Sequence, residues 1–340
     1  MKPLVNEHVQ ITILQTNDIH GHVKSSSHWG TDQEAHGMAR LSSLIKNRRI
    51  EDPELLLFDT GDMLKGSPLT YHYAKYNDHM PNPMISIMNH LQYDCATIGE
   101  FDFDYGVPFL SRAIGRSFFP WLAANVVHKT TKEPYFGFPY TVKTVKGVKI
   151  AILGVSATRK TDEGPYIVKD ILFEDAYFSA KRWVGFIHEN ESPDLVILNY
   201  HGSFNEKSSR SIDQADRICT IDGIDILLTG REHIKICEER DGKFVMQSGS
   251  FGTDLGEIQV SLSRFGSSYK VETIKGQWLS ADHAESDKEV EKLVHFQELE
   301  TLNWSMSETA EKHFSAIDSE DQLIKDWLEN LRLKDYIDFF

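Results

Sequence analysis

The sequence predicts an α/β fold, and two observations carry this prediction. Short apolar runs typical of buried strands alternate along much of the chain with stretches of helical periodicity. Five of these runs end in turns that carry Asp, Glu or His, and α/β sheets place their ligands at the carboxyl ends of strands. The 340 residues are enough for one large α/β domain or two ordinary domains.

The predicted elements follow one another in a regular order. Apolar runs predict strands at 9–16, 55–58, 94–98, 148–155, 195–198 and 224–228, and helical spacing predicts helices at 37–49 and 84–91. The runs 244–247, 257–262 and 269–274 alternate polar and apolar residues between Gly turns, so we expect antiparallel strands that close a second sheet. A polar helix is expected at 285–313 and a short amphipathic helix at 321–335.

The composition is that of an acidic globular protein. Lys and Arg number 36 and Asp and Glu number 51, and the resulting net charge of −15 argues against binding to a nucleic-acid polymer or a membrane. Residues 1–8 lack the apolar segment of a signal peptide, and no apolar stretch of about 18 residues occurs, so we expect a cytoplasmic protein. The three cysteines are widely spaced, which favours free thiols over a disulfide framework.

Fifteen histidines raise the question of a metal site, because His is the commonest metal ligand. Five residues stand in turns that follow four predicted strands: Asp18, His20, Asp62, His201 and His233. Carboxylates and imidazoles suit divalent Mn, Zn, Fe or Co. The alternative is a set of satisfied polar turns without metal, but four strand ends of the same chemistry favour a site for one ion, or for two ions bridged by Asp62.

Several motifs occur in a fixed order along the chain. They are LQTNDIHG at 14–21, FDTGD at 58–62 with GSPL at 66–69, IGEFDFDYG at 98–106, FPWLAANV at 119–126 and QSGSFG at 247–252. With these motifs the chain resembles the catalytic domain of the 5'-nucleotidase and 2',3'-cyclic-nucleotide 2'-phosphodiesterase family, which are calcineurin-like metallophosphoesterases. The resemblance implies a four-layer α-β-β-α sandwich, a dinuclear metal site and metal-dependent hydrolysis of nucleotide phosphoesters.

The resemblance also implies a division of the chain and a type of partner. Residues 9–284 would form the metallophosphoesterase domain, 285–316 a linker helix, and 317–340 a helical tail similar to the start of a C-terminal domain. In full-length relatives that second domain closes over the metals. We therefore expect a small phosphorylated ligand, a nucleotide, and a second domain or subunit that covers the cleft.

By position in the motifs, the resemblance assigns roles to individual residues. Asp18, His20 and His233 are similar to ligands of the first metal, Asp62 to the bridging carboxylate, and His201 to a ligand of the second metal. Asp62 is also expected to take part in catalysis.

Three positions depart from the family pattern. Glu100 replaces an Asn that ligates the second metal, Phe101 replaces a His that assists phosphoryl transfer, and Arg231 replaces a His ligand. Glu100 can still ligate through oxygen, so we expect it to bind the second metal. Arg231 has no lone pair to donate, so it either pairs with Glu100 as a fixed positive charge or holds the substrate phosphate as a catalytic residue.

These departures leave two functions open. Phe101 offers no proton to the transition state, where general acid–base catalysis typically contributes about 10²–10⁴-fold. One function is a metal-dependent nucleotide phosphoesterase of weakened or altered activity. The other is a catalytically impaired relative that binds a nucleotide, phosphate or protein partner.

Overall fold

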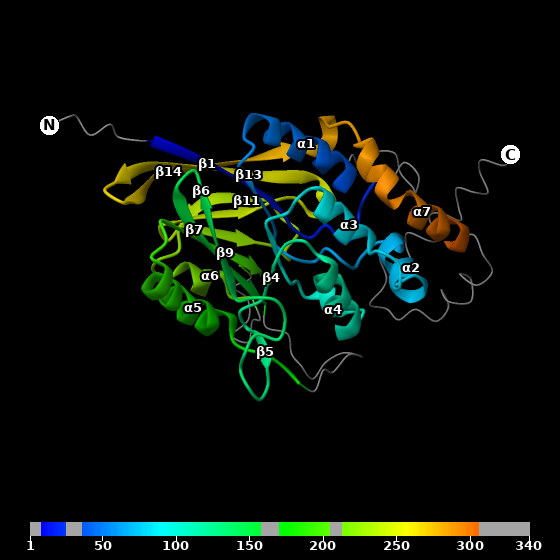
Figure 1. The fold of residues 1–340 in the computed structure, drawn as a ribbon, viewed down its shortest axis with the longest axis horizontal. Coiled ribbons are helices and arrows are strands. Elements are labelled where there is room, and N and C mark those ends of the chain that lie inside the picture. Colours follow the sequence, from blue (N-terminus) through cyan, green and yellow to red (C-terminus); the bar gives the residue numbers. More distant parts are fainter. Residues whose placement is uncertain (1–7, 25–35, 158–169, 205–212, 306–340) are drawn as a thin grey trace.

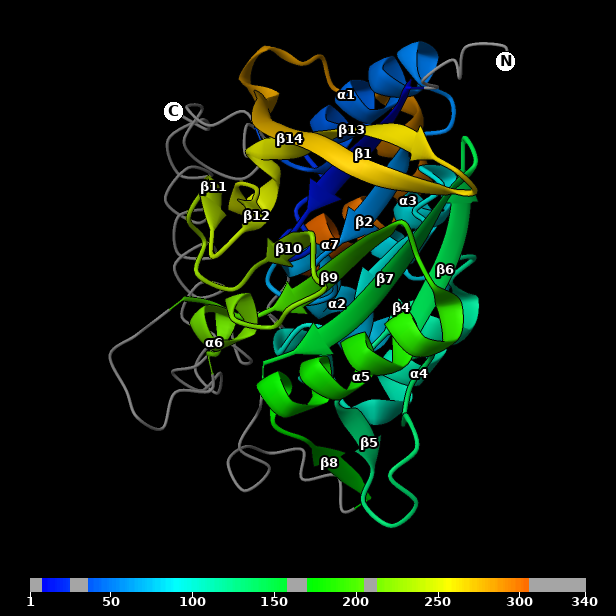
Figure 2. The same cartoon turned by 90° about the vertical axis from the view of Figure 1, so that its left-hand side faces the viewer.

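The computed structural model describes residues 8–24, 36–157, 170–204 and 213–305. Two six-stranded sheets pack face to face, and helices cover the outer face of each sheet (Figure 1, Figure 2). This arrangement confirms the four-layer α-β-β-α sandwich that the resemblance implies. None of the described helices combines the length and the apolar character needed to cross a bilayer.

The first sheet has four parallel strands and two antiparallel strands at one edge. Its spatial order is β14 (Ser268–Ser280), β13 (Asp254–Phe265), β1 (His8–Thr16), β2 (Leu56–Asp59), β3 (Cys95–Thr97) and β4 (Trp121–Leu122). Strands β1 to β4 are parallel, whereas β13 pairs antiparallel with both β1 and β14.

The second sheet has a parallel centre and an antiparallel strand at each edge. Its spatial order is β11 (Ile236–Arg240), β12 (Lys243–Gln247), β10 (Ile226–Thr229), β9 (Leu195–His201), β7 (Val148–Ser156) and β6 (Tyr140–Val145). A further two-stranded sheet joins β5 (Val126–His128) to β8 (Ile171–Phe173).

Helices are divided between the two outer faces. The first sheet is covered by α1 (Met38–Glu51), α2 (Pro68–Tyr76), α3 (Pro83–His90), α4 (Val107–Arg116) and α7 (Lys288–Ser305). The second is covered by α5 (Ala176–Glu191) and α6 (Ala215–Cys219). Three short 3₁₀ turns complete the described elements: Phe101–Phe103, Ser250–Gly252 and Ala281–His283. Figure 2 shows α5 lying across β7.

Residue alternation explains why the strands read as apolar runs in the sequence. Ile11 and Ile13 of β1 point into the core between the sheets, whereas Leu14 points toward the helices. In β7, Ile152 faces the same inter-sheet core and Leu153 faces α5. A strand that is buried on both faces has few solvent-exposed positions, so most of its residues are apolar.

The prediction that the last three strands close a second sheet is wrong in part. The runs at 244–247, 257–262 and 269–274 do not all close the second sheet. Only β12 belongs to it, and β12 pairs parallel with β10, while β13 and β14 extend the first sheet beside β1. Alternation of polar and apolar residues predicts a strand with one exposed face, but it does not indicate which sheet the strand joins.

Helix α7 covers the predicted helix at 285–313 in part. Val290 and Val294 are buried against the helices of the first sheet, and the Ser42 hydroxyl of α1 donates to Asp287 just before α7 begins. The expected tail at 317–340 and the helix at 321–335 lie outside the described residues. The division at 284 and 316 therefore stays a prediction.

Candidate metal centre

The turns that follow β1 and β2 are joined by their backbones. The N–H of Asp18 donates to the carbonyl of Gly61 at 3.0 Å, and the N–H of His20 donates to the carbonyl of Asp62 at 2.8 Å. Asp18, His20 and Asp62 have φ values of 49°, 51° and 59°, in a region that is strained for residues other than glycine. Such strain persists only where the surrounding contacts over-determine the backbone, and it is typical of functional sites.

Asp18, His20 and His233 form the first group of candidate ligands. Asp18 Oδ1 lies 3.9 Å from His20 Nε2 and 3.7 Å from His233 Nε2, and the two Nε2 atoms are 3.0 Å apart. The Nδ1–H of His20 donates to the carbonyl of Lys65 at 2.9 Å, which leaves Nε2 of the neutral ring with a lone pair. Burial lowers the pKa of His233, which favours the neutral form that binds metal.

Asp62 and His201 are fully buried and form the second group together with Asp18. The Nδ1–H of His201 donates to the carbonyl of Thr60 at 2.7 Å, and Nε2 lies 3.1 Å from Asp62 Oδ2. Burial disfavours the charged forms of Asp62 and His201, but the attraction between the two charges is stronger than the effect of burial. This attraction raises the pKa of His201 and holds the pKa of Asp62 below its usual value. Asp62 is therefore a carboxylate at neutral pH, as a metal ligand must be.

Three buried atoms of these groups have no hydrogen bond outside the cluster: Asp18 Oδ1, Asp62 Oδ2 and His201 Nε2, of which the last two face each other at 3.1 Å. Buried polar atoms are almost always paired, so a cluster of such atoms is suited to bind a further partner. Within each group the candidate ligand atoms lie within 4.8 Å of one another. Because carboxylate oxygen and imidazole nitrogen suit Mn, Zn, Fe and Co, the five residues fit a divalent cation.

Asp102 holds the turn that carries Asp62. Its two carboxylate oxygens accept the backbone N–H groups of Asp62, Met63, Leu64 and Gly99 at 2.8 to 3.1 Å. Burial and the neighbouring Asp62 carboxylate raise the pKa of Asp102 to about 6. Asp102 therefore fixes the backbone of a candidate ligand without offering an oxygen of its own.

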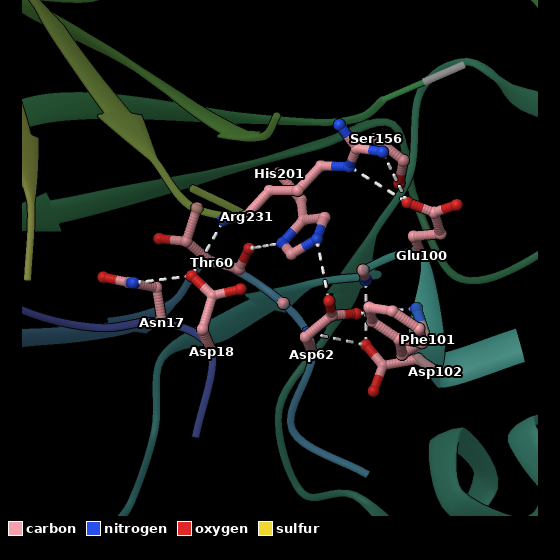
Figure 3. A network of polar contacts seen from close by, with 12 residues as sticks. Asn17, Asp18, Thr60, Asp62, Glu100, Phe101, Asp102, Ser156, His201 and Arg231 are labelled. Atoms are coloured by element: carbon pink, nitrogen blue, oxygen red, sulfur yellow. Dashed lines mark hydrogen bonds and ion pairs between the residues drawn. The ribbon is translucent and has the colours of Figure 1, made fainter. Parts of the chain in front are cut away.

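Arg231 lies beside Asp18 and His201 and pairs with Glu100 (Figure 3). Its backbone N–H donates to Asp18 Oδ2 at 2.8 Å. Its guanidinium donates to Glu100 Oε2 at 2.9 Å from both Nε and Nη2, and to Asp213 Oδ2 at 2.6 Å from Nη1. Burial disfavours the charge, but the two carboxylates outweigh burial and raise the pKa of Arg231. The side-chain amide of Asn17 also donates to Asp18 Oδ2, at 2.7 Å.

Of the two alternatives for Arg231, the structure contains the pairing with Glu100. It does not bring Glu100, expected to bind the second metal, into either group of candidate ligands. Binding of a substrate phosphate by Arg231, and ligation by Glu100, stay predictions.

Two aromatic rings line the first group. Phe101 is 39% exposed, its ring centroid lies 5.7 Å from that of His20, and its N–H donates to Asp62 Oδ1 at 2.8 Å. Phe251 lies 5.5 Å from His20 and 5.1 Å from His233, and it has a positive φ of 58°. The rings hold the imidazoles in place but supply neither a charge nor a proton to a substrate.

Sequence reasoning missed three residues of this site. Asp102 stands inside a motif that was recognised, but no pattern distinguishes its role from that of Asp104. Asp213 precedes α6, and nothing in the sequence connects it to Arg231. Phe251 follows a Gly-rich turn and reads as an ordinary loop residue. All three act through tertiary contacts, which spacing along the chain does not encode.

Comparisons with known proteins agree with this geometry. Residues 11–235 match the family model described as calcineurin-like phosphoesterase. The chain belongs to this family. In solved structures, the fold of this phosphoesterase is similar to the crystal structure of calcineurin-like phosphoesterase YfkN from Bacillus subtilis, with a TM-score of 0.78 and 25% identity over 88% of this chain and 99% of that chain.

Two curated relatives are similar over most of this chain. The trifunctional nucleotide phosphoesterase protein YfkN of Bacillus subtilis is 28% identical over 304 residues, which are 79% of this chain and 20% of the relative. The 2',3'-cyclic-nucleotide 2'-phosphodiesterase/3'-nucleotidase of Haemophilus influenzae is 33% identical over 240 residues, which are 66% of this chain and 36% of the relative. The chain thus spans roughly a fifth to a third of the length of these relatives.

Proposed function

We propose that this phosphoesterase hydrolyses nucleotide phosphoesters with the help of a divalent cation. Five residues hold the cation in this proposal: Asp18, His20, Asp62, His201 and His233. The observation that carries the proposal is the convergence of the two groups of candidate ligand atoms, within 4.8 Å in each group, on the buried side chains of Asp18, Asp62 and His201. A divalent cation accepts lone pairs from both oxygen and nitrogen, so it can be bound by all three atoms at once.

A bound divalent cation would act as a Lewis acid toward a phosphoryl oxygen and lower the pKa of a water molecule. The chain's own residues prepare the ligands for it. The carbonyls of Lys65 and Thr60 accept the Nδ1–H groups of His20 and His201, which fixes each ring with Nε2 toward the carboxylates. Asp102 holds the backbone of Asp62, so the ligands are ordered by contacts behind them.

The proposed substrate class follows from the relatives and from charge. Both curated relatives are named for nucleotide phosphoesters. A protein of net charge −15 needs a local positive centre to attract a phosphate, and the cation provides that centre. The proposed partner is accordingly a small phosphorylated ligand, and a second domain or subunit over the cleft belongs to the same proposal.

Turnover of bis(4-nitrophenyl) phosphate, 2',3'-cyclic AMP and 5'-AMP by chelator-treated protein, before and after addition of Mn²⁺, tests this function. We expect Mn²⁺-dependent product release from at least one nucleotide. His201→Ala should lower the stimulated rate at least about 10²-fold, because it removes a ligand. His188→Ala is the matched control, since His188 lies away from the site and bonds to the Gly223 carbonyl. Absence of stimulated turnover on all three substrates would refute the proposal.

A second candidate function is binding of a nucleotide without turnover. It is favoured by Phe101, which stands beside His20 and offers no proton to a leaving group. The triple variant Glu100→Asn, Phe101→His, Arg231→His separates the two functions. If the wild type shows no metal-stimulated turnover and the triple variant does, binding is the natural function and hydrolysis is not.

A further inference from the structure

Phe101 stands at the edge of the candidate metal centre but offers no assistance to a leaving group. Its ring centroid lies 5.7 Å from that of His20, and its N–H donates to Asp62 Oδ1 at 2.8 Å. A phenyl ring gives neither a charge nor a proton to the oxygen that departs when a phosphoester bond breaks. A positive group close to Phe101 would supply that assistance through its charge.

Lys65 places such a positive group at the Phe101 ring. The ammonium lies over the ring, with Nζ 5.4 Å from the centroid. The Lys65 side chain is only 13% exposed, and a charge that is partly shielded from water acts more strongly on a neighbouring charge than one in bulk water does. The same ring therefore contacts an imidazole of the first ligand group and an ammonium.

Asp104 holds the Lys65 ammonium in place. Its Oδ2 accepts from Lys65 Nζ at 2.9 Å. Asp104 follows the 3₁₀ turn Phe101–Phe103, and its N–H donates to the carbonyl of Phe101 at 3.1 Å, so one turn carries both the carboxylate and the ring. An ammonium has three N–H donors, so a contact with Asp104 is compatible with a contact to a substrate oxygen.

The backbone of Lys65 is packed directly against a candidate ligand. Its carbonyl accepts the Nδ1–H of His20 at 2.9 Å, and a Cβ on the next residue, Gly66, would lie 2.6 Å from the His20 Cβ. Arg231 also lies beside the candidate ligands, but two carboxylates hold its guanidinium. The ammonium of Lys65 is therefore the better candidate for a contact with substrate.

We propose that Lys65 contacts the substrate and stabilises the negative charge that forms on the leaving oxygen. This inference rests on the proposed function, because it concerns the same hydrolysis. The oxygen of a water molecule forms a bond to phosphorus, and its released proton passes to the solvent. The bond from phosphorus to the leaving oxygen breaks, its electron pair stays on that oxygen, and the oxygen then takes a proton from the solvent. Lys65 keeps its proton throughout and acts through its charge, and Asp104 is its positioning residue.

Two esters of thymidine 5'-phosphate test this role, because they differ only in the group that leaves. The 4-nitrophenyl ester releases a stable anion that needs little assistance, whereas the phenyl ester releases a more basic anion that needs more. We expect Lys65→Met to lower kcat on the phenyl ester about 10²-fold and on the 4-nitrophenyl ester less than about 3-fold. Lys65→Arg should recover most of the rate on the phenyl ester, because it keeps the charge.

Lys75→Met is the matched control. Lys75 also lies over an aromatic ring, that of Tyr71, with Nζ 5.7 Å from the centroid, and it belongs to α2 outside the candidate ligands. This variant should leave both rates unchanged. Manganese per chain in desalted protein is a second readout. It should be equal in wild type and Lys65→Met, because the contact of Lys65 with His20 uses a backbone carbonyl that the substitution keeps.

An equal loss on the two esters, or no loss on the phenyl ester, would overturn the inference while the proposed function stands. Loss of bound manganese from Lys65→Met would also overturn it, since the side chain would then act on the metal site. If the wild type hydrolyses neither ester, the inference is overturned, and the proposed function falls with it only if its own three substrates are inert too. If Lys65→Met does not fold, Lys65→Gln, whose amide can still donate to Asp104, takes its place in the comparison.

Discussion

The two sides of the site differ in how their charges are satisfied. On one side, Asp18, Asp62 and His201 present buried atoms that have no hydrogen bond outside their own cluster. On the other side, Glu100 receives the guanidinium of Arg231 at 2.9 Å from two nitrogens. The side with Asp18, Asp62 and His201 needs a bound metal cation, whereas on the other side the Arg231 guanidinium already supplies the positive charge. Acidic residues in a cleft therefore do not indicate a metal by themselves; unpaired lone pairs among them do.

We expect the largest effect, a loss of stability, from Asp102→Ala, which disrupts the turn on the metal side of the site. The substitution leaves the buried N–H groups of Asp62, Met63, Leu64 and Gly99 without an acceptor. Since each unsatisfied buried group costs about 1–3 kcal/mol, we expect the free energy of unfolding to fall by about 3–5 kcal/mol. Urea denaturation of chelator-treated protein measures this loss.

Asp102→Asn is the comparison for that prediction, because its single oxygen can still accept two of the four N–H groups, whereas its amide nitrogen only donates. It should lose clearly less stability than Asp102→Ala. A loss in Asp102→Asn as large as that in Asp102→Ala would contradict the prediction, because the remaining oxygen would then contribute nothing to the turn.

A smaller effect, confined to the metal side, is expected from Gly99→Ala. The added Cβ would lie 2.2 Å from Asp62 Oδ1 and 2.3 Å from Asp62 N, so the carboxylate must move. We expect Mn²⁺ affinity, measured by calorimetric titration, to fall about 10–100-fold, as it does when residues that orient a ligand are changed. Gly185→Ala is the control, because its Cβ would meet nothing within 4 Å and should leave Mn²⁺ binding unchanged.

The smallest effect is the dependence of thermal stability on pH. In chelator-treated protein, attraction to Asp62 outweighs burial and raises the pKa of His201 from 6.5 to about 10. A raised pKa stabilises the fold fully below pH 6.5, and this contribution is lost as the pH rises toward 10. We expect the Tm of the chelator-treated wild type to fall by about 5 °C between pH 6.5 and 10.

His201→Gln should remove this part of the pH dependence, because the variant has no proton to lose at that position. If the Tm of His201→Gln fell as steeply as that of the wild type, another group would be responsible. Added Mn²⁺ should also flatten the wild-type curve, because the cation replaces the proton between Asp62 and His201.

The sequence was most informative where residues follow strands. Asp18, His20 and Asp62 were predicted to meet because parallel strands end at one edge of a sheet, and the structure brings them together with His201 and His233. The four-layer fold came from the resemblance, since apolar runs alone do not show how two sheets pack. The same runs placed β13 and β14 in the wrong sheet, because strand neighbours are decided by tertiary packing.

The partners of Arg231 show which contacts could not be predicted from the sequence. Pairing with Glu100 could be predicted as one of two alternatives, because both residues stand at positions where the family has metal ligands. Asp213 could not be predicted, because it reaches Arg231 only through the packing of α6 against the second sheet. The charge balance of a folded site depends on contacts between residues of different elements. The number of bound ions could therefore not be predicted from the sequence.

The most direct test of the central claim is the anomalous difference map of a crystal soaked with Mn²⁺. The account predicts a peak bounded by Asp18, Asp62 and the imidazoles of His20, His201 and His233. A map with no peak at these residues, or with its peak between Glu100 and Asp213, would contradict it.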